Sequence, residues 1–262
     1  MARIDRATAK VRPEATAPTF TMPPIYKPGT ASHLKMVLFG PPGTGKTTGA
    51  VSGSGKKLLI LTEPDGDLPL AGRDDIDVVS PKDGKELYAT IQALHGGMVN
   101  DYDRVVLDSV TFAFERTGKA DLTRVLEAGK DPRHVYGMVG ASVSQMVHDL
   151  VALPTHVIFT TQLKSDSISD EIDEPGPEEG KFPFTLAVTP MVYKVLAPAV
   201  SVRGRTYKAM YVDAAGNKKA RYMVSFEDYG KSPAGSRLAG LPLTVEDLNV
   251  DALIELIGKE KA

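Results

Sequence analysis

Eight consecutive residues have the types and spacing of a loop that binds phosphate. Gly40-Pro41-Pro42-Gly43-Thr44-Gly45-Lys46-Thr47 fits the pattern G-x-x-x-x-G-K-[ST] at every position. Glycines let the backbone adopt turns that direct several N–H groups toward one anion, and the positive end of a following helix would add to this attraction. We expect Lys46 to reach the β- and γ-phosphates of ATP and the Thr47 hydroxyl to bind Mg²⁺. The other loop residues, together with Thr48, are predicted to surround the phosphates.

Three polar residues that follow short apolar runs could complete a hydrolytic site. Each run resembles a buried parallel strand, and the carboxyl ends of such strands form the rim where ligands bind. Asp108 could hold Mg²⁺, Glu63 could orient the attacking water, and Gln162 could contact the γ-phosphate and pass its state to the following loop. The alternatives are an exposed glutamate in an acidic turn and a glutamine that only ends a strand.

The elements that must position these residues alternate between strand and helix patterns. This alternation predicts an α/β fold with a mostly parallel central sheet, flanking helices and a C-terminal antiparallel β-hairpin extension. The predicted strands are Met36–Phe39, Lys57–Leu61, Arg104–Leu107 and His156–Thr160, the clearest helices are Glu86–Leu94 and Val139–Val151, and the hairpin strands are Tyr207–Val212 and Arg221–Phe226.

The outer parts of the chain have different compositions. Residues 1–33 are rich in proline and basic side chains and are predicted to form a flexible arm, either disordered or packed on a neighbouring subunit. Residues 34–262 are predicted to form one domain. Within it, residues 163–183 are expected to form an acidic loop, and Thr244-x-x-Asp247 predicts a C-terminal helix over about 244–258.

The overall composition excludes several classes of protein. The 262 residues carry 31 Lys+Arg and 33 Asp+Glu, a formal charge of −2, so no basic field covers the whole chain. The absence of cysteine excludes disulfide scaffolds and thiolate metal sites, and the five histidines lack metal-ligand spacing. No apolar run reaches the ~18 residues that a membrane span requires. We therefore expect a cytoplasmic protein without a membrane partner.

Together these motifs resemble the core of the RecA/RadA-type recombinases over about residues 34–240. They look most like the compact single-domain ATPases that phages encode for recombination and single-strand annealing. The resemblance implies a RecA-like P-loop fold, ATP-dependent self-assembly on single-stranded DNA, and ATP held between subunits of a homo-oligomer. A single-strand-binding protein is a further expected partner. It also implies the P-loop roles of Lys46 and Thr47, the metal role of Asp108, the catalytic role of Glu63 and the sensor role of Gln162.

The same resemblance implies a cation supplied across the subunit boundary. Lys231 is the first candidate and Arg237 the second.

One departure from this family concerns DNA. The loop after the sensor glutamine contacts DNA in the recombinases, yet here Ser165–Gly180 carries seven carboxylates and no basic residue. These charges would repel a phosphate backbone. DNA affinity must therefore come from other basic residues, and the candidates are the N-terminal arm, Lys119, Arg124, Lys130, Arg133, Arg203 and Arg205. With no tryptophan and 6% aromatic residues, no stacking platform is obvious.

Three other functions compete with this interpretation. The sequence from Gly40 to Thr48 is also typical of AAA+ ATPases that remodel or load protein partners. Against that function stand Ser109, where those proteins place a glutamate, and a C-terminal third that reads as strands. A GTPase would need an N-K-x-D motif, and a small-molecule kinase would need a second substrate pocket, neither of which we find.

Overall fold

The computed structural model describes residues 33–165, 184–213, 216–227 and 232–259. The predicted N-terminal arm therefore lies outside the described residues apart from its last residue, as do all seven carboxylates of the predicted acidic loop. Within the described part of the chain, none of the helices combines the length and the apolar composition that a bilayer-spanning segment needs.

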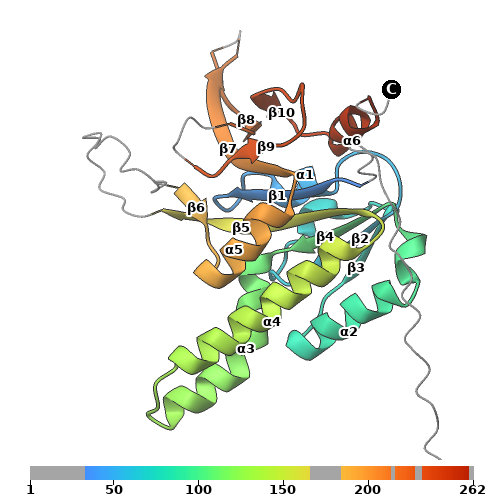
Figure 1. Ribbon diagram of the computed structural model, residues 1–262. Helices are drawn as coiled ribbons and strands as arrows, with labels where there is room; N and C mark the ends of the chain where they lie inside the picture. Colours follow the sequence, from blue (N-terminus) through green and yellow to red (C-terminus); the bar gives the residue numbers. More distant parts are fainter. Residues whose placement is uncertain (1–32, 166–183, 214–215, 228–231, 260–262) are drawn as a thin grey trace, which may run out of the picture. The chain divides into compact units, whose positions relative to one another are not determined.

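A single twisted sheet organises the described residues (Figure 1). Its main path runs β10-β8-β7-β1-β5-β4-β2-β3, while β6 pairs with β5 and β9 pairs with β7. The six strands from β7 to β3 are parallel, whereas β8 and β10 are antiparallel additions at one side. The strands are β1 Lys35–Gly40, β2 Lys57–Leu61, β3 Ile76–Val79, β4 Arg104–Asp108, β5 His156–Ser165, β6 Phe184–Leu186, β7 Val202–Val212, β8 Lys218–Ser225, β9 Gly235–Ser236 and β10 Thr244–Glu246.

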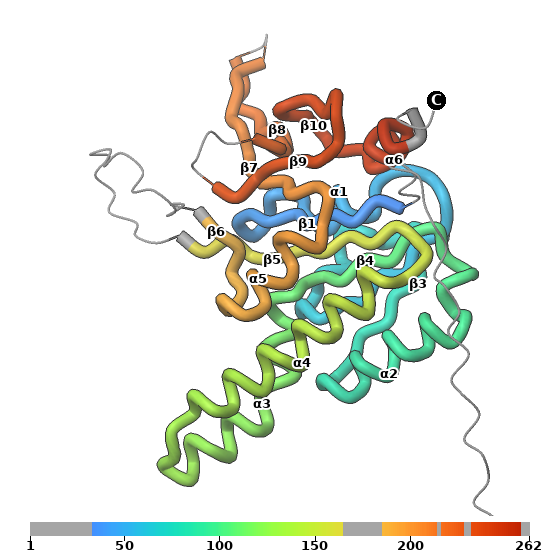
Figure 2. Tube along the Cα trace, viewed as in Figure 1, coloured from blue at the N-terminus to red at the C-terminus, as the bar shows by residue number. Residues whose placement is uncertain are grey.

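Helices cover both faces of this sheet. Buried side chains of α2 to α5 pack against one face, with alternate strand residues such as Phe39 and Phe159. Residues of α1 and α6 pack against the other face. In Figures 1 and 2, α3 and α4 lie side by side and extend away from the sheet. The helices are α1 Lys46–Ala50, α2 Gly84–His95, α3 Val110–Glu127, α4 Arg133–Ala152, α5 Pro190–Ala199 and α6 Val250–Lys259, with short 3₁₀ turns at Leu68–Leu70 and Met98–Asp101.

This arrangement confirms the predicted α/β fold class, with a mostly parallel sheet, flanking helices and C-terminal antiparallel strands, and each predicted strand is present. The strand that carries Asp108 is separated from β1 by β5, so that the phosphate-binding loop, Glu63, Asp108 and Gln162 are carried by four neighbouring strands, β1, β2, β4 and β5. The structure adds an element that we did not predict, the edge strand β3, whose four residues are too few to show a clear pattern.

Several predicted boundaries differ from the structure: β7 and β8 begin at Val202 and Lys218 instead of Tyr207 and Arg221, and α4 begins at Arg133 instead of Val139. Two further differences change the type of local structure. The C-terminal helix begins at Val250 instead of about 244, because Thr244–Glu246 pairs with β8 and Asp247 has a positive φ of 46° that a helix cannot contain. The acidic loop begins after Ser165 instead of at residue 163, because Leu163–Ser165 pairs with β6. In both places a pairing between distant strands decides the local conformation.

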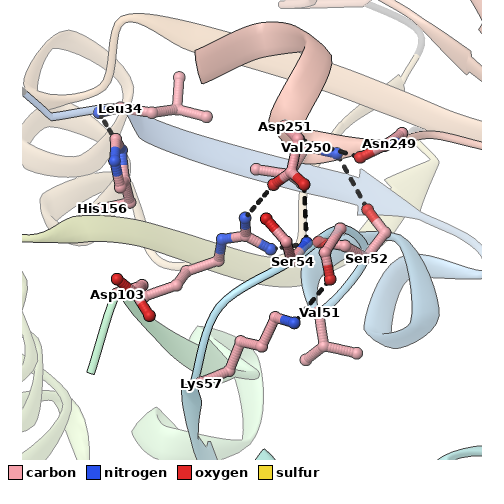
Figure 3. Close-up of polar contacts among 12 residues, drawn as sticks. Leu34, Val51, Ser52, Ser54, Lys57, Asp103, His156, Asn249, Val250 and Asp251 are labelled. Carbon is pink, nitrogen blue, oxygen red and sulfur yellow. Dashed lines mark hydrogen bonds and ion pairs between the residues drawn. The ribbon is translucent and has the colours of Figure 1, made fainter. Parts of the chain in front are cut away.

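A buried arginine, Arg104, joins α6 to the segment that follows α1. Figure 3 shows Asp251 of α6 beside Ser52 and Ser54 of that segment. Arg104 is 1% exposed, and its guanidinium donates to the carbonyl of Ser52 and to Asp251 Oδ1 at 3.2 Å. The other carboxylate oxygen of Asp251 accepts from the N–H of Ser54 at 2.7 Å. Burial lowers the pKa of Arg104, and the charge of Asp251 opposes this effect. Asp251 therefore compensates a charge in the core.

We expect Asp251→Ala to lower the free energy of unfolding by about 2–3 kcal/mol. Leaving a buried charge without its partner costs ~3–5 kcal/mol, and the partial exposure of Asp251 reduces that figure. Urea denaturation measures the change, and Glu255→Ala on the exposed side of the same helix is the matched control. Equal stability of the two variants would show that Asp251 does not hold α6 in place.

Candidate nucleotide-binding site

The predicted phosphate-binding loop lies between β1 and α1, at the carboxyl end of the sheet. Its shape depends on two glycines. A Cβ at Gly40 would lie 2.1 Å from Thr206 Oγ1 of β7, and Gly45 has a φ of 81° that other residues rarely adopt. Thr44 also shares a hydrogen bond of 2.7 Å with Thr206. Since α1 is only five residues long, the loop N–H groups rather than a long helix must provide most of the attraction for phosphate.

Lys46 is held over this loop by oxygen atoms. Its side chain is 6% exposed, and Nζ donates to the carbonyls of Gly40 at 2.9 Å and Pro41 at 2.8 Å. A longer contact of 3.3 Å reaches Gln162 Oε1. Burial lowers the pKa of Lys46, while the nearby carboxylates of Glu63 and Asp108 raise it. The ammonium group therefore lies in the loop where a phosphate oxygen could replace a carbonyl partner.

Thr47 and Asp108 come together as predicted. Thr47 Oγ1 donates to Asp108 Oδ2 at 2.6 Å, and the hydroxyl of Thr160 donates to Oδ1. Asp108 is fully buried, and a buried carboxylate with a neighbouring hydroxyl is a hard oxygen donor set that suits Mg²⁺. The described residues contain no group of three or more His, Cys, Asp or Glu side chains that could hold a metal alone. Mg²⁺ characteristically takes few protein ligands and completes its coordination with phosphates and water.

Glu63 and Gln162 meet at the same rim. The backbone carbonyl of Asp108 accepts from the N–H groups of Thr62 and Glu63, which fixes the end of β2 against the end of β4. Gln162 Nε2 donates to both carboxylate oxygens of Glu63, at 3.1 and 3.2 Å. The amide of Gln162 thereby bridges Glu63 and Lys46. Burial and the charge of Asp108 raise the pKa of Glu63, against the effects of Lys46 and Gln162.

The C-terminal hairpin provides a wall of this site that the sequence did not reveal. A pocket of about 610 Å³ contains the loop, Glu63 and, from distant parts of the chain, Lys208, Tyr222 and Asp247. A Cβ on Gly45 would lie 3.2 Å from the ring of Tyr222, and Lys208 Nζ lies 5.3 Å from the centre of that ring. The only sequence signal was the alternation of β7 and β8, which could not show which face meets the loop.

We expect Tyr222→Ala to weaken nucleotide binding roughly fivefold to tenfold, because a lost aromatic wall costs about 1–1.5 kcal/mol. Titration with a fluorescent ADP analogue measures the affinity. Tyr211→Ala, on the opposite face of the same hairpin, is the matched control. Because the chain has no tryptophan, Tyr222→Trp also gives a single reporter whose emission should change when ADP binds. Unchanged affinity in Tyr222→Ala, together with a silent Tyr222→Trp reporter, would exclude this ring from the site.

The other predicted residues do not converge on this pocket. Lys231 lies outside the described residues. Arg237 is exposed and donates to the carbonyl of Pro198. It does not line the nucleotide pocket of the same chain. Arg203 donates to two backbone carbonyls, which gives it a structural role. Lys119 and Arg124 line a second groove of about 850 Å³ along α3, next to Pro64.

Comparisons with known proteins give one matching family and distant similarity to solved structures. The family model described as AAA domain matches residues 32–238. The comparison with curated proteins found no match. Among solved structures, the RadB recombinase is 17% identical, covering 81% of this chain and 86% of that one with a TM-score of 0.43. The flagellar accessory protein FlaH from Methanocaldococcus jannaschii is 11% identical, covering 81% and 84% with a TM-score of 0.39.

The family match spans most of the chain and includes Lys46, Thr47, Glu63, Asp108 and Gln162. The chain therefore belongs to the AAA domain family and has a P-loop ATPase core.

Proposed function

We propose that this protein is a Mg²⁺-dependent ATPase that acts on single-stranded DNA in homologous recombination, annealing or repair of the phage type. The observation that carries the proposal is the position of Glu63. It reaches the rim from β2, next to Lys46 and Gln162, whereas the residue after Asp108 is Ser109. This is the arrangement that the recombinase resemblance implies.

The proposed reaction is attack of water on the γ-phosphate of ATP. Glu63 accepts a hydrogen bond from the water and orients it, and its raised pKa makes it a stronger base than an exposed glutamate. Lys46 stabilises the negative charge that develops on the phosphate oxygens. Thr47 and Asp108 would hold Mg²⁺, which supplies further charge neutralisation when bound. Gln162 would release Lys46 when a phosphate oxygen takes its place, so that β5 responds to the nucleotide through Gln162.

We also propose a homo-oligomer with ATP at the subunit boundary. The pocket contains Lys46 and Lys208 as its basic side chains among the described residues, which leaves room for a cation from a neighbour. Arg237 lies outside its own pocket, as a residue acting on the next subunit must, and Lys231 is the other candidate. A single-strand-binding protein remains a proposed partner.

Steady-state ATP hydrolysis at low salt tests this function, with oligo-dT, with duplex DNA and without DNA. Light scattering with and without ATP reports assembly in the same samples. We expect oligo-dT to increase the rate more than duplex DNA does, and ATP to increase the particle size. A rate that no DNA changes would exclude the DNA-dependent part of the proposal.

A second candidate is an AAA+-like ATPase that remodels or loads a protein partner, which the family description favours. The C-terminal part argues against it, because beyond β5 the described residues form mainly strands with α5 and α6, and not a bundle of helices. Hydrolysis that is indifferent to DNA and rises with a folded protein substrate would favour this candidate.

A further inference from the structure

The hairpin of β7 and β8 extends beyond the sheet that supports it. Only Met36–Phe39 of β1 pairs with β7, at Val202–Arg205. From Arg205 to Val212, β7 pairs with β8 instead. Figure 2 shows this ribbon rising from the body of the sheet. Both of its faces are therefore available near its end.

These two faces carry different side chains, because neighbouring residues of a strand point to opposite sides. Lys208 and its cross-strand partner Tyr222 face the nucleotide pocket. Tyr207 and Tyr211 lie on the opposite face, which we call the outer face. Arg221 lies opposite Ala209 on this face. Lys219 is likewise paired with Tyr211.

The ribbon is strongly basic in a chain that is slightly acidic. Residues 202–225 contain six basic side chains and one acidic one, although the whole chain has a formal charge of −2. Such a local excess of positive charge attracts a polyanion. The chain as a whole has no net positive charge that would attract a polyanion, so a local basic surface such as this hairpin has to supply the attraction.

The outer face combines this charge with two partly exposed aromatic rings. The guanidinium of Arg221 lies 4.1 Å from the ring centre of Tyr211, and both tyrosines are partly exposed. Arg221 pairs with Glu246 at 3.3 Å and Lys219 pairs with Asp213 at 2.9 Å. In each pair the basic side chain is about half exposed, and exposed pairs contribute only ~0–1 kcal/mol. A phosphate group can therefore replace Glu246 at Arg221 at little cost, whereas Asp213 is 18% exposed and also accepts from the N–H of Asn217, so its pair with Lys219 is harder to displace.

We propose that the outer face of the β7–β8 hairpin binds single-stranded nucleic acid, with bases stacked on Tyr207 and Tyr211 and phosphates on Lys219 and Arg221. The rings on β7 and the cations on the neighbouring β8 lie side by side on this face, an arrangement that suits the bases and phosphates of a single strand. A duplex buries its base faces and cannot use the rings in this way. This inference rests on the proposed function and assigns it a site on β7 and β8.

The site also suggests how the two ligands communicate. Lys208 lies between Tyr207 and Ala209 in one strand, so a strand bound to the outer face and a nucleotide bound to the inner face contact adjacent residues. Thr206 connects the same strand to Thr44 of the phosphate-binding loop. The two ligands would therefore contact the same strand from opposite faces.

Fluorescence anisotropy of labelled oligo-dT with the full chain tests the inference at low salt. We expect the double variant Tyr207→Ala/Tyr211→Ala to weaken binding of oligo-dT about tenfold or more, because stacking of each base on an aromatic ring contributes to the binding free energy. Tyr207→Phe/Tyr211→Phe keeps the rings and should bind as the unaltered chain does. Lys219→Ala and Arg221→Ala should each reduce the slope of log affinity against log salt by about one. Met210→Ala, whose side chain is on the inner face, is the surface control.

The outcomes separate this inference from the proposed function. If the unaltered chain binds oligo-dT and the alanine double variant binds equally well, the hairpin site is wrong and the proposed function stands. If the unaltered chain binds no strand, both are wrong. If duplex DNA competes as well as oligo-dT, stacking on the tyrosines is excluded. Retained binding of a fluorescent ADP analogue in every variant shows that the hairpin is still folded.

Discussion

Lys46→Ala should lower ATP hydrolysis by about two orders of magnitude or more, because a preorganised group that stabilises developing charge contributes at least that much. The side chain is already held in the loop by the carbonyls of Gly40 and Pro41, so little reorganisation is needed when phosphate arrives. The substitution also removes the hydrogen bond from Lys46 to Gln162, so that Gln162 contacts Glu63 but no longer links it to the loop. Steady-state phosphate release at saturating ATP measures the loss.

Lys85→Ala provides the matched control, because this lysine is exposed on the first turn of α2, outside the pocket. It should hydrolyse ATP at the rate of the unaltered chain. Circular dichroism of both variants checks that each remains folded. Normal turnover in Lys46→Ala would mean that the loop does not bind the reacting phosphate, and the proposed reaction would be wrong.

Local sequence patterns could predict much of this site because its residues follow strands. The loop from Gly40 to Thr47 is one continuous segment, and its glycine positions agree with the backbone that the structure requires at Gly40 and Gly45. Glu63, Asp108 and Gln162 each follow an apolar run, and parallel pairing alone brings such ends together. Pairing of this kind needs no knowledge of individual contacts.

The hairpin wall could not be predicted in the same way. Tyr222 is far from Gly45 in the sequence, and their contact depends on β7 pairing with β1 and on the register of β8. A register shift of one residue would exchange Tyr222 with Arg221 and reverse the two faces. The helix start at Val250 was missed for a related reason, because Thr244 has a helix-capping pattern but pairs with Ser225.

Glu63→Gln should lower kcat by about 10²- to 10⁴-fold and leave nucleotide affinity nearly unchanged. The glutamine introduced at position 63 has the same size as the glutamate and can still contact Gln162. Its amide cannot accept a proton from the attacking water. Asp67→Asn is the matched control. It removes a charge from the exposed acidic turn that follows Glu63, so it separates a specific role of Glu63 from an effect of local charge.

The pH dependence of kcat gives this prediction a second readout. The ionised form of Glu63 is the active base, and burial beside Asp108 raises its pKa above that of an ordinary glutamate. As the pH falls, the unaltered chain should therefore lose activity at a higher pH than an exposed carboxylate would dictate. The residual activity of Glu63→Gln should lack this step, whereas Asp67→Asn should keep it. If Glu63→Gln retained both the rate and this loss of activity at low pH, the base would have to be another residue. The catalytic role that we assign to Glu63 would then be wrong.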